Sequence, residues 1–255
     1  MARSNLKPIL NSILSPLHLE MHRRGTEAYW EQRADQLISD LKGYHYLKNL
    51  WLRQLSPRTV IDVGANTGQF SKQIRMLLPH SVIYAFEPLP DCFEAFQAAF
   101  AKDELVTAFN VGLAESVGEL VFERNEFSPS SSFLKIAQAH TGAFPHTLRT
   151  SKEVVRVDRL DHVANSLVLA SPLLLKIDAQ GYEDKILYGG EETARMADTI
   201  LVETSFVELY EQQPLFDDIY LLLKRWGFAY QGSFDQLRDP RTGRTLQEDS
   251  VFVKC

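Results

Sequence analysis

The feature that most constrains the fold is an alternation, from Ser56 to the C-terminus, of short apolar runs with segments of helical periodicity. Apolar runs rich in β-branched and aromatic residues are typical of buried strands, whereas apolar side chains three or four positions apart are typical of helices. The alternation predicts an α/β fold in which helices cover both faces of a mainly parallel sheet. Strands are expected at 59–63, 82–86, 105–109, 119–123, 154–157, 173–178, 199–203, 227–234 and 250–253.

The N-terminal region has a different pattern. Residues 1–55 contain apolar side chains at helical spacing, from Tyr29 and Trp30 to Trp51 and Leu55. We therefore expect a helical N-terminal extension over 1–55 and one α/β domain over 56–255. The extension is interpreted as a packing segment. The alternative is a cap or dimerisation arm, which leaves open a homodimer through the N-terminal helices.

Charge and cysteine content narrow the possible partners and setting. The 255 residues include 27 Lys and Arg against 33 Asp and Glu, a formal net charge of −6. Nucleic-acid binding requires clustered positive charge, so no nucleic-acid partner is expected. Two cysteines form no disulfide framework, which favours a reducing, cytoplasmic location. No transmembrane segment or signal peptide is expected, because no stretch approaches about 18 apolar residues.

Candidate ligand-binding residues follow the first two predicted strands. Ligands of parallel sheets bind at the carboxyl ends of the strands. The turn from Asp62 to Gly68 carries two glycines, which permit close backbone approach, and Glu87 is placed to accept hydrogen bonds from a ribose diol. The turn lacks the G-x-G-x-x-G pattern of dinucleotide sites. Because Asp62 would repel a phosphate, the residues favour a zwitterionic sulfonium nucleoside over NAD.

Several motifs in register resemble the FkbM family of S-adenosyl-L-methionine-dependent methyltransferases over roughly residues 58–255. They comprise the runs Val60–Phe70, Tyr84–Pro88, Asn110–Leu113, Ser130–Ser132, Val157–Asp161 and Leu175–Glu183. The resemblance implies a Rossmann-like class I methyltransferase fold with a mainly parallel seven-stranded sheet and a C-terminal antiparallel hairpin. It also implies S-adenosyl-L-methionine as cofactor, S-adenosyl-L-homocysteine as product and O-methylation of a hydroxyl.

The same resemblance assigns cofactor-binding residues by position. The cofactor loop corresponds to Asp62, Gly64, Asn66 and Gly68, the ribose-binding acid to Glu87, and the third-strand motif to Asn110, as the residues stand here. One position departs from the family pattern. Many relatives have Glu where this chain has Gln180, so a second charged carboxylate is absent there, although the amide could hydrogen-bond to substrate.

The candidate catalytic residues are Asp178, Glu203 and Gln180, at or after the ends of two predicted strands. Methylation of an alcohol requires loss of its proton, and a positioned base contributes roughly 10²–10⁴-fold. Asp178 is the first candidate for that base; the alternative is an N-cap for a helix beginning near Gly181. Asp178 and Glu203 also offer oxygen ligands suited to a divalent cation, but no metal is predicted.

Residues 125–151 form a polar segment without clear periodicity, and long segments of this kind are often functional or mobile. Ser128–Ser132 are hypothesised to contact cofactor or acceptor, whereas His140 and His146 are interpreted as solvated loop residues.

The leading hypothesis is an O-methyltransferase acting on a small molecule or glycan: a sugar, glycolipid or polyketide-type metabolite. The alternatives are an NAD-dependent oxidoreductase and a non-catalytic nucleoside-binding protein.

Overall fold

The computed structural model describes residues 50–255, beginning with helix α3 (Leu50–Leu55). The predictions made for residues 1–49, including dimerisation through them, lie outside the described residues. Within 50–255, no helix combines the length and apolar character needed to cross a bilayer. Residues 52–255 form one compact unit, which contains every element considered below.

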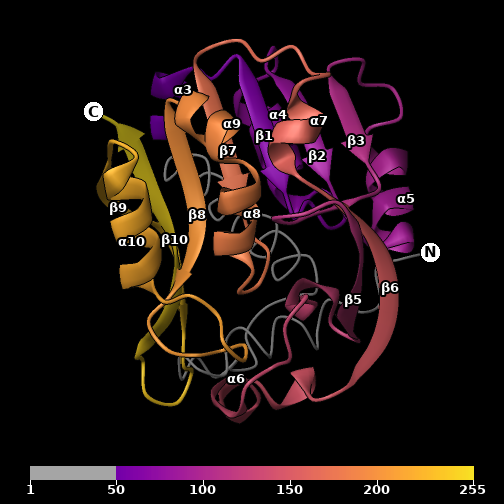
Figure 1. The fold of residues 1–255 in the computed structure, drawn as a ribbon, viewed down its shortest axis with the longest axis vertical. Coiled ribbons are helices and arrows are strands. Elements are labelled where there is room, and N and C mark those ends of the chain that lie inside the picture. Colours follow the sequence, from indigo (N-terminus) through magenta and orange to yellow (C-terminus); the bar gives the residue numbers. More distant parts are fainter. Residues whose placement is uncertain (1–49) are drawn as a thin grey trace, which may run out of the picture. The chain divides into compact units, whose positions relative to one another are not determined.

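Over residues 50–255, the central sheet has seven strands, of which only β10 runs against the others. This finding confirms the predicted mainly parallel sheet and C-terminal antiparallel hairpin (Figure 1). In spatial order the strands are β3 (Val106–Phe109), β2 (Val82–Phe86), β1 (Thr59–Val63), β7 (Leu173–Ile177), β8 (Thr199–Ser205), β10 (Thr245–Lys254) and β9 (Phe228–Arg238).

Helices pack on both faces because neighbouring strand residues point to opposite sides. In β2, Ala85 packs with Phe96 of α5, whereas Tyr84 and Phe86 join the large core on the other face. That core includes Leu187 of α8 and other residues of α8, α9 and α10. The helices are α4 (Gln69–Leu77), α5 (Pro90–Ala99), α7 (Leu160–Ala164), α8 (Glu183–Gly189), α9 (Glu191–Met196) and α10 (Phe216–Arg225).

The strand register brings the candidate site residues to one edge of the sheet. Val63 at the end of β1 pairs with Phe86 of β2 on one side and Ile177 of β7 on the other. The residues that follow these three strands therefore lie side by side at the same edge of the sheet. They include Gly64, Glu87 and Asp178.

A second, three-stranded sheet carries the polar segment. It is formed by β4 (Gly112–Leu113), β6 (Thr150–Asp158) and β5 (Gly118–Asn125), and Figure 1 shows the β5–β6 ribbon extending past the end of the main sheet. Between β5 and β6 lie α6 (Gln138–Ala143) and the single 3-10 turns η2 (Ser128–Ser130) and η3 (Pro145–Thr147). Strand β6 is longer than the predicted 154–157 because it pairs with the full length of β5.

At Gly64 the turn after β1 lies directly against the turn after β7. Its φ of +74° is left-handed, and a Cβ atom there would lie 1.8 Å from the backbone oxygen of Asp178. No side chain fits that space. A glycine at this position is therefore what allows the cofactor loop to lie directly against the turn that carries Asp178.

We predict that Gly64→Ala destabilises the protein far more than Gly243→Ala. Gly243 has φ +72°, and a Cβ there would meet nothing within 4 Å, so both variants incur the left-handed cost of about 1–2 kcal/mol. Gly64→Ala adds overpacking of roughly 1–3 kcal/mol. Thermal unfolding should show a Tm gap of at least about 2–4 °C between them; equal Tm values would contradict the close approach.

Candidate active site

A buried ammonium group, that of Lys176, joins the ends of β1 and β7. Its Nζ lies 3.2 Å from Asp62 Oδ1 and 3.4 Å from Asp178 Oδ2, and donates to the carbonyl oxygens of Val63 and Gly64 at 3.3 Å. Burial lowers the pKa of Lys176, but the charges of Asp178 and Asp62 outweigh it and hold the pKa above its usual value. The group is therefore charged at neutral pH.

Sequence reasoning did not single out Lys176, although a signal was present. It is the one charged residue within the apolar strand Leu173–Ile177. A charge in a strand whose every residue is buried requires a partner, and the two aspartates supply it.

Asp62, a predicted cofactor-binding residue, is fully enclosed in this structure. Its side chain has no exposed surface, and Oδ2 accepts a 2.7 Å hydrogen bond from Ser71 Oγ in α4. Together with Lys176, this bond ties β1 to α4 and to β7. The structure therefore places Asp62 beneath the cofactor loop, and its contribution to cofactor binding stays a prediction.

The cofactor loop and the predicted ribose acid are in contact. Glu87 Oε2 accepts from the backbone N–H of Asn66 at 2.8 Å, and Oε1 accepts from the backbone N–H of Leu89 at 2.9 Å. Burial raises the pKa of Glu87 to about 7, although the two N–H donors and Lys176 oppose the shift. This carboxyl group therefore changes charge near neutral pH.

The remaining predicted cofactor residues complete the same edge. Gly68 is the residue that precedes α4, and Asn110 Nδ2 donates to the carbonyl oxygens of Glu87 and Pro88, each at 3.0 Å. Asn66 Nδ2 donates to Ser128 Oγ at 3.3 Å. The structure thus brings the six predicted cofactor residues to one end of the sheet and adds Ser128 to them.

The three predicted catalytic residues form one hydrogen-bonded group. Gln180 Nε2 donates to Asp178 Oδ1 and to Glu203 Oε2, each at 2.8 Å. The side chain of Asp178 is 34% exposed, so its carboxylate stays accessible. Burial raises the pKa of Glu203 well above its usual value, and the nearby charges of Asp178 and Glu183 add to the shift.

The alternative role of Asp178 as a helix cap is wrong. Helix α8 begins at Glu183 rather than near Gly181, and Asp178 makes no bond to its first backbone N–H groups. Instead, Glu183 Oε1 accepts from the backbone N–H groups of Ala179 and Gly181 at 3.0 and 3.1 Å. Asp178 is thus left free of a capping role.

Two groups from elsewhere in the chain close this cluster. Tyr210, fully buried, donates from its hydroxyl to Gln180 Oε1 at 2.7 Å. Ser132, from the polar segment, donates from Oγ to the backbone oxygen of Gln180 at 2.7 Å. The sequence favours contacts of Ser128–Ser132 with cofactor or acceptor, but no local signal links Ser132 or Tyr210 to Gln180.

The interpretation of His140 as a solvated residue is wrong. Its side chain is 3% exposed, and its ring makes edge contacts with those of Phe144 and Tyr210 at 5.6 and 5.2 Å. Burial, with a smaller contribution from His146, lowers the pKa of His140 to about 4. His140 is therefore neutral at physiological pH and packs beneath Tyr210.

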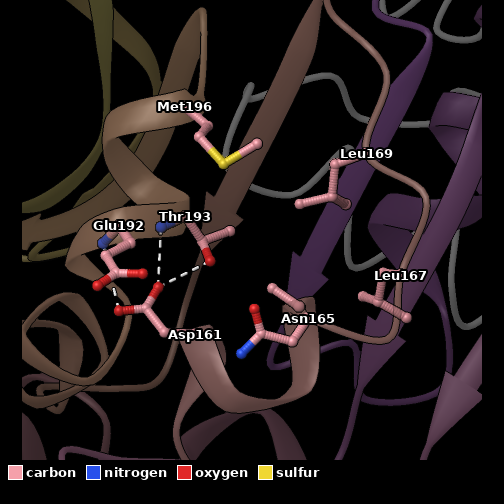
Figure 2. Close-up of a pocket in the computed structure, with 8 residues that line it drawn as sticks. Asp161, Asn165, Leu167, Leu169, Glu192, Thr193 and Met196 are labelled. Carbon is pink, nitrogen blue, oxygen red and sulfur yellow. Dashed lines mark hydrogen bonds between the residues drawn. The ribbon is translucent and has the colours of Figure 1, made fainter.

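A cavity of about 250 Å³ lies away from this cluster (Figure 2). It is bordered by α7, α9 and the segment leading into β7, so it is near the amino ends of β7 and β8. Asp161 on its wall accepts hydrogen bonds from the backbone N–H groups of Glu192 and Thr193. The cavity therefore belongs to a different region from the candidate active site.

Within residues 50–255, no group of three His, Cys, Asp or Glu side chains is arranged to hold a metal ion. The pair Asp178 and Glu203 is linked by an amide instead.

The strand order, with helices on both faces of a mainly parallel sheet, is a Rossmann-like α/β arrangement. The chain belongs to the FkbM methyltransferase family, since the model of the methyltransferase FkbM domain matches residues 62–230. The chain is therefore an S-adenosylmethionine-dependent methyltransferase. This class replaces the two alternatives given above, an NAD-dependent oxidoreductase and a non-catalytic nucleoside-binding protein.

Three relatives show the range of the family. The 2-O-methyltransferase NoeI of Sinorhizobium fredii is 26% identical, over 69% of this chain and 74% of the relative. The hexuronic acid methyltransferase AglP of Haloferax volcanii is 23% identical, over 65% and 64%. The 31-O-demethyl-FK506 methyltransferase FkbM of Streptomyces tacrolimicus is 26% identical, over 72% and 78%.

We predict that Lys176→Met strongly destabilises the protein. The change leaves the enclosed Asp62 without its counter-charge, and breaking a buried pair costs about 3–5 kcal/mol. Lys152→Met is the matched control, because the Lys152 side chain is 67% exposed and its variant should stay within about 0.5 kcal/mol of the wild type. Denaturant unfolding measures both. A loss no larger than that of the control would contradict the central role of Lys176.

Proposed function

We propose that the protein transfers the methyl group of S-adenosylmethionine to a hydroxyl oxygen of a sugar or glycan, a glycolipid or a polyketide-type metabolite. The observation that carries this proposal is Asp178, a partly exposed carboxylate held beside the cofactor loop at the end of β7. The names of the relatives support it, because two of them specify O-methylation and a third a sugar acid.

The described residues fit the proposed cofactor. The turn at Gly64 places the cofactor loop directly against the backbone of Asp178, and the carboxyl group of Glu87 lies at the neighbouring strand end, as a ribose diol requires. Each Glu87 oxygen accepts one backbone N–H and retains a second acceptor site. S-adenosylmethionine, when bound, supplies a methyl group already activated by its sulfonium charge.

The chain's own residues would then supply alignment and a proton acceptor. Asp178 accepts the proton of the acceptor hydroxyl, so that the oxygen attacks as it loses its proton. Lys176 holds the Asp178 carboxylate by charge, and Gln180 holds it by a hydrogen bond. Because the donor is already activated, correct placement of the hydroxyl accounts for most of the remaining rate enhancement.

The net charge of −6 supports a small or neutral acceptor over a nucleic acid. A screen with methyl-labelled S-adenosylmethionine tests the acceptor class directly, using panels of sugars, nucleotide sugars, glycolipids and polyketides. Label transfer to a hydroxyl of one class supports the proposal. Label transfer only to nucleic acid or protein would overturn it.

We predict that Asp178→Asn lowers kcat by roughly 10²–10⁴-fold on the acceptor found in that screen, because the amide cannot take the hydroxyl proton. The Kd for S-adenosylmethionine, measured by calorimetry, should change little. Asp158→Asn, which alters a carboxylate paired with His162, is the matched control and should retain activity. Unchanged turnover in Asp178→Asn would remove Asp178 from the mechanism.

We predict that the affinity for S-adenosylmethionine rises with pH between 6 and 8. A ribose diol donates to the ionised form of Glu87, whose pKa of about 7 leaves it partly protonated in this range. If binding fully ionises Glu87, the affinity for S-adenosylmethionine should rise by up to roughly tenfold between pH 6 and 8. At pH 7, binding should release about half a proton.

Calorimetry in two buffers of different ionisation enthalpy measures that proton. Glu87→Gln should remove this part of the pH dependence, while titration of the ligand's own amino group persists in both proteins. The same pH dependence in wild type and Glu87→Gln would contradict the ribose role of Glu87.

A further inference from the structure

Gln180 occupies the space between two carboxylates. Both donors of its amide are used, one on Asp178 Oδ1 and one on Glu203 Oε2, each at 2.8 Å. A carboxylate pair in a partly buried site otherwise needs a shared proton or a cation between its oxygens. Here the neutral amide satisfies both oxygens.

We propose that Gln180 is a positioning residue for Asp178, and that Tyr210 fixes the direction in which its amide donates. The proposal rests on the proposed function, in which Asp178 is the base. It deepens that function by assigning roles to Gln180 and Tyr210 that do not involve contact with the substrate.

The direction of the Gln180 amide is set by the Tyr210 hydroxyl. This hydroxyl lies 2.7 Å from Gln180 Oε1 and 3.3 Å from the carbonyl oxygen of Ser130, so its single hydrogen favours the shorter contact. Burial and the charge of Glu203 raise the pKa of Tyr210 well above its usual value, so the hydroxyl stays a donor. A reversed amide would place its oxygen against the Asp178 carboxylate and its NH₂ against that hydrogen.

The backbone of Gln180 is held by the polar segment. Gln180 has a left-handed φ of +54°, which is unfavourable for a residue with a side chain. Ser132 Oγ donates to its carbonyl oxygen at 2.7 Å, and the same Oγ accepts from the backbone N–H of Leu134 at 2.9 Å. Tyr210 and Ser132 thus fix the side chain and the backbone of one residue from two separate segments.

These contacts restrict the orientation of the Asp178 carboxylate. Oδ1 is held by Gln180 and Oδ2 faces Lys176, so the group cannot rotate freely although it is one-third exposed. If the Gln180 amide lost its fixed direction, Asp178 would keep only the contact with Lys176. Its carboxylate would then no longer be held in the orientation needed for proton transfer.

A spectroscopic test uses Tyr210→Phe, which removes the hydroxyl and keeps the ring. Tyr230→Phe is the matched control, because the Tyr230 hydroxyl also makes one short bond, to Glu248 Oε1 at 2.7 Å. The side-chain NH₂ signals of Gln180 are identified in a nitrogen–proton NMR spectrum by their loss in Gln180→Glu. They should move toward those of solvent-exposed glutamines in Tyr210→Phe and stay in place in Tyr230→Phe; unchanged signals in Tyr210→Phe would overturn the proposal.

A kinetic test uses the acceptor identified by the label-transfer screen. Tyr210→Phe should lower kcat by about 5–10-fold, the equivalent of one lost hydrogen bond in the transition state, with an unchanged Kd for S-adenosylmethionine. Gln180→Leu, which removes both donors at similar volume, should lower kcat further and move the acid limb of the pH–rate profile to higher pH. Wild-type kcat and pH profile in Gln180→Leu would overturn the positioning role.

The two tests separate this proposal from the proposed function. The NMR comparison needs neither cofactor nor acceptor, so it decides the amide direction even if the screen finds no hydroxyl acceptor. Should Tyr210→Phe fail to fold, Gln180→Leu gives the kinetic answer, and Ser132→Ala should shift the same NH₂ signals by loosening the Gln180 backbone.

Discussion

The candidate site depends on one buried positive charge. Lys176 lies within a strand whose residues are all buried, and it is stable there because Asp62 and Asp178 approach it from two strand ends. The enclosed Asp62 could not be held as it is without that ammonium group, since a buried charge requires a counter-charge. The same contact fixes the spacing between the cofactor loop and the proposed base. The stability of the fold and the position of the proposed base therefore depend on the same interaction.

From this charge, two hydrogen-bonded arms extend along the end of the sheet. One runs through the cofactor loop to Glu87 and Asn110, where backbone N–H groups and a side-chain amide hold the second and third strand ends together. The other runs through Asp178 to Gln180 and Glu203. The segment between β5 and β6 contacts both arms, through Ser128 on Asn66 and Ser132 on Gln180. These two contacts place the segment against the candidate site.

The Gln180 amide gives this chain its own solution to a general electrostatic problem. Two carboxylates at neighbouring strand ends repel each other, and the raised pKa of Glu203 reflects that repulsion together with burial. The neutral Gln180 side chain donates to one oxygen of each group without adding charge. The direction of the amide depends on Tyr210, whose ring packs against His140 of α6. The ordered side chains of the candidate site therefore extend into the polar segment between β5 and β6.

The sequence by itself predicts the seven strands of the main sheet, their mainly parallel arrangement and the strand-end residues of the candidate site, but it misses β4 and the full lengths of β6, β9 and β10. Periodicity specifies elements, and the carboxyl ends of parallel strands meet at one edge. The sequence therefore places Asp62, Glu87, Asp178 and Glu203 at one location.

Only the tertiary structure decided which of these groups touch. The structure shows that helix α8 begins at Glu183, which leaves Asp178 without a capping role. It also shows that Lys176 contacts the enclosed Asp62, that the buried His140 packs on Tyr210 and that Tyr210 bonds to Gln180, and these three contacts join residues far apart along the chain. Such contacts depend on register and packing, and no local pattern encodes them.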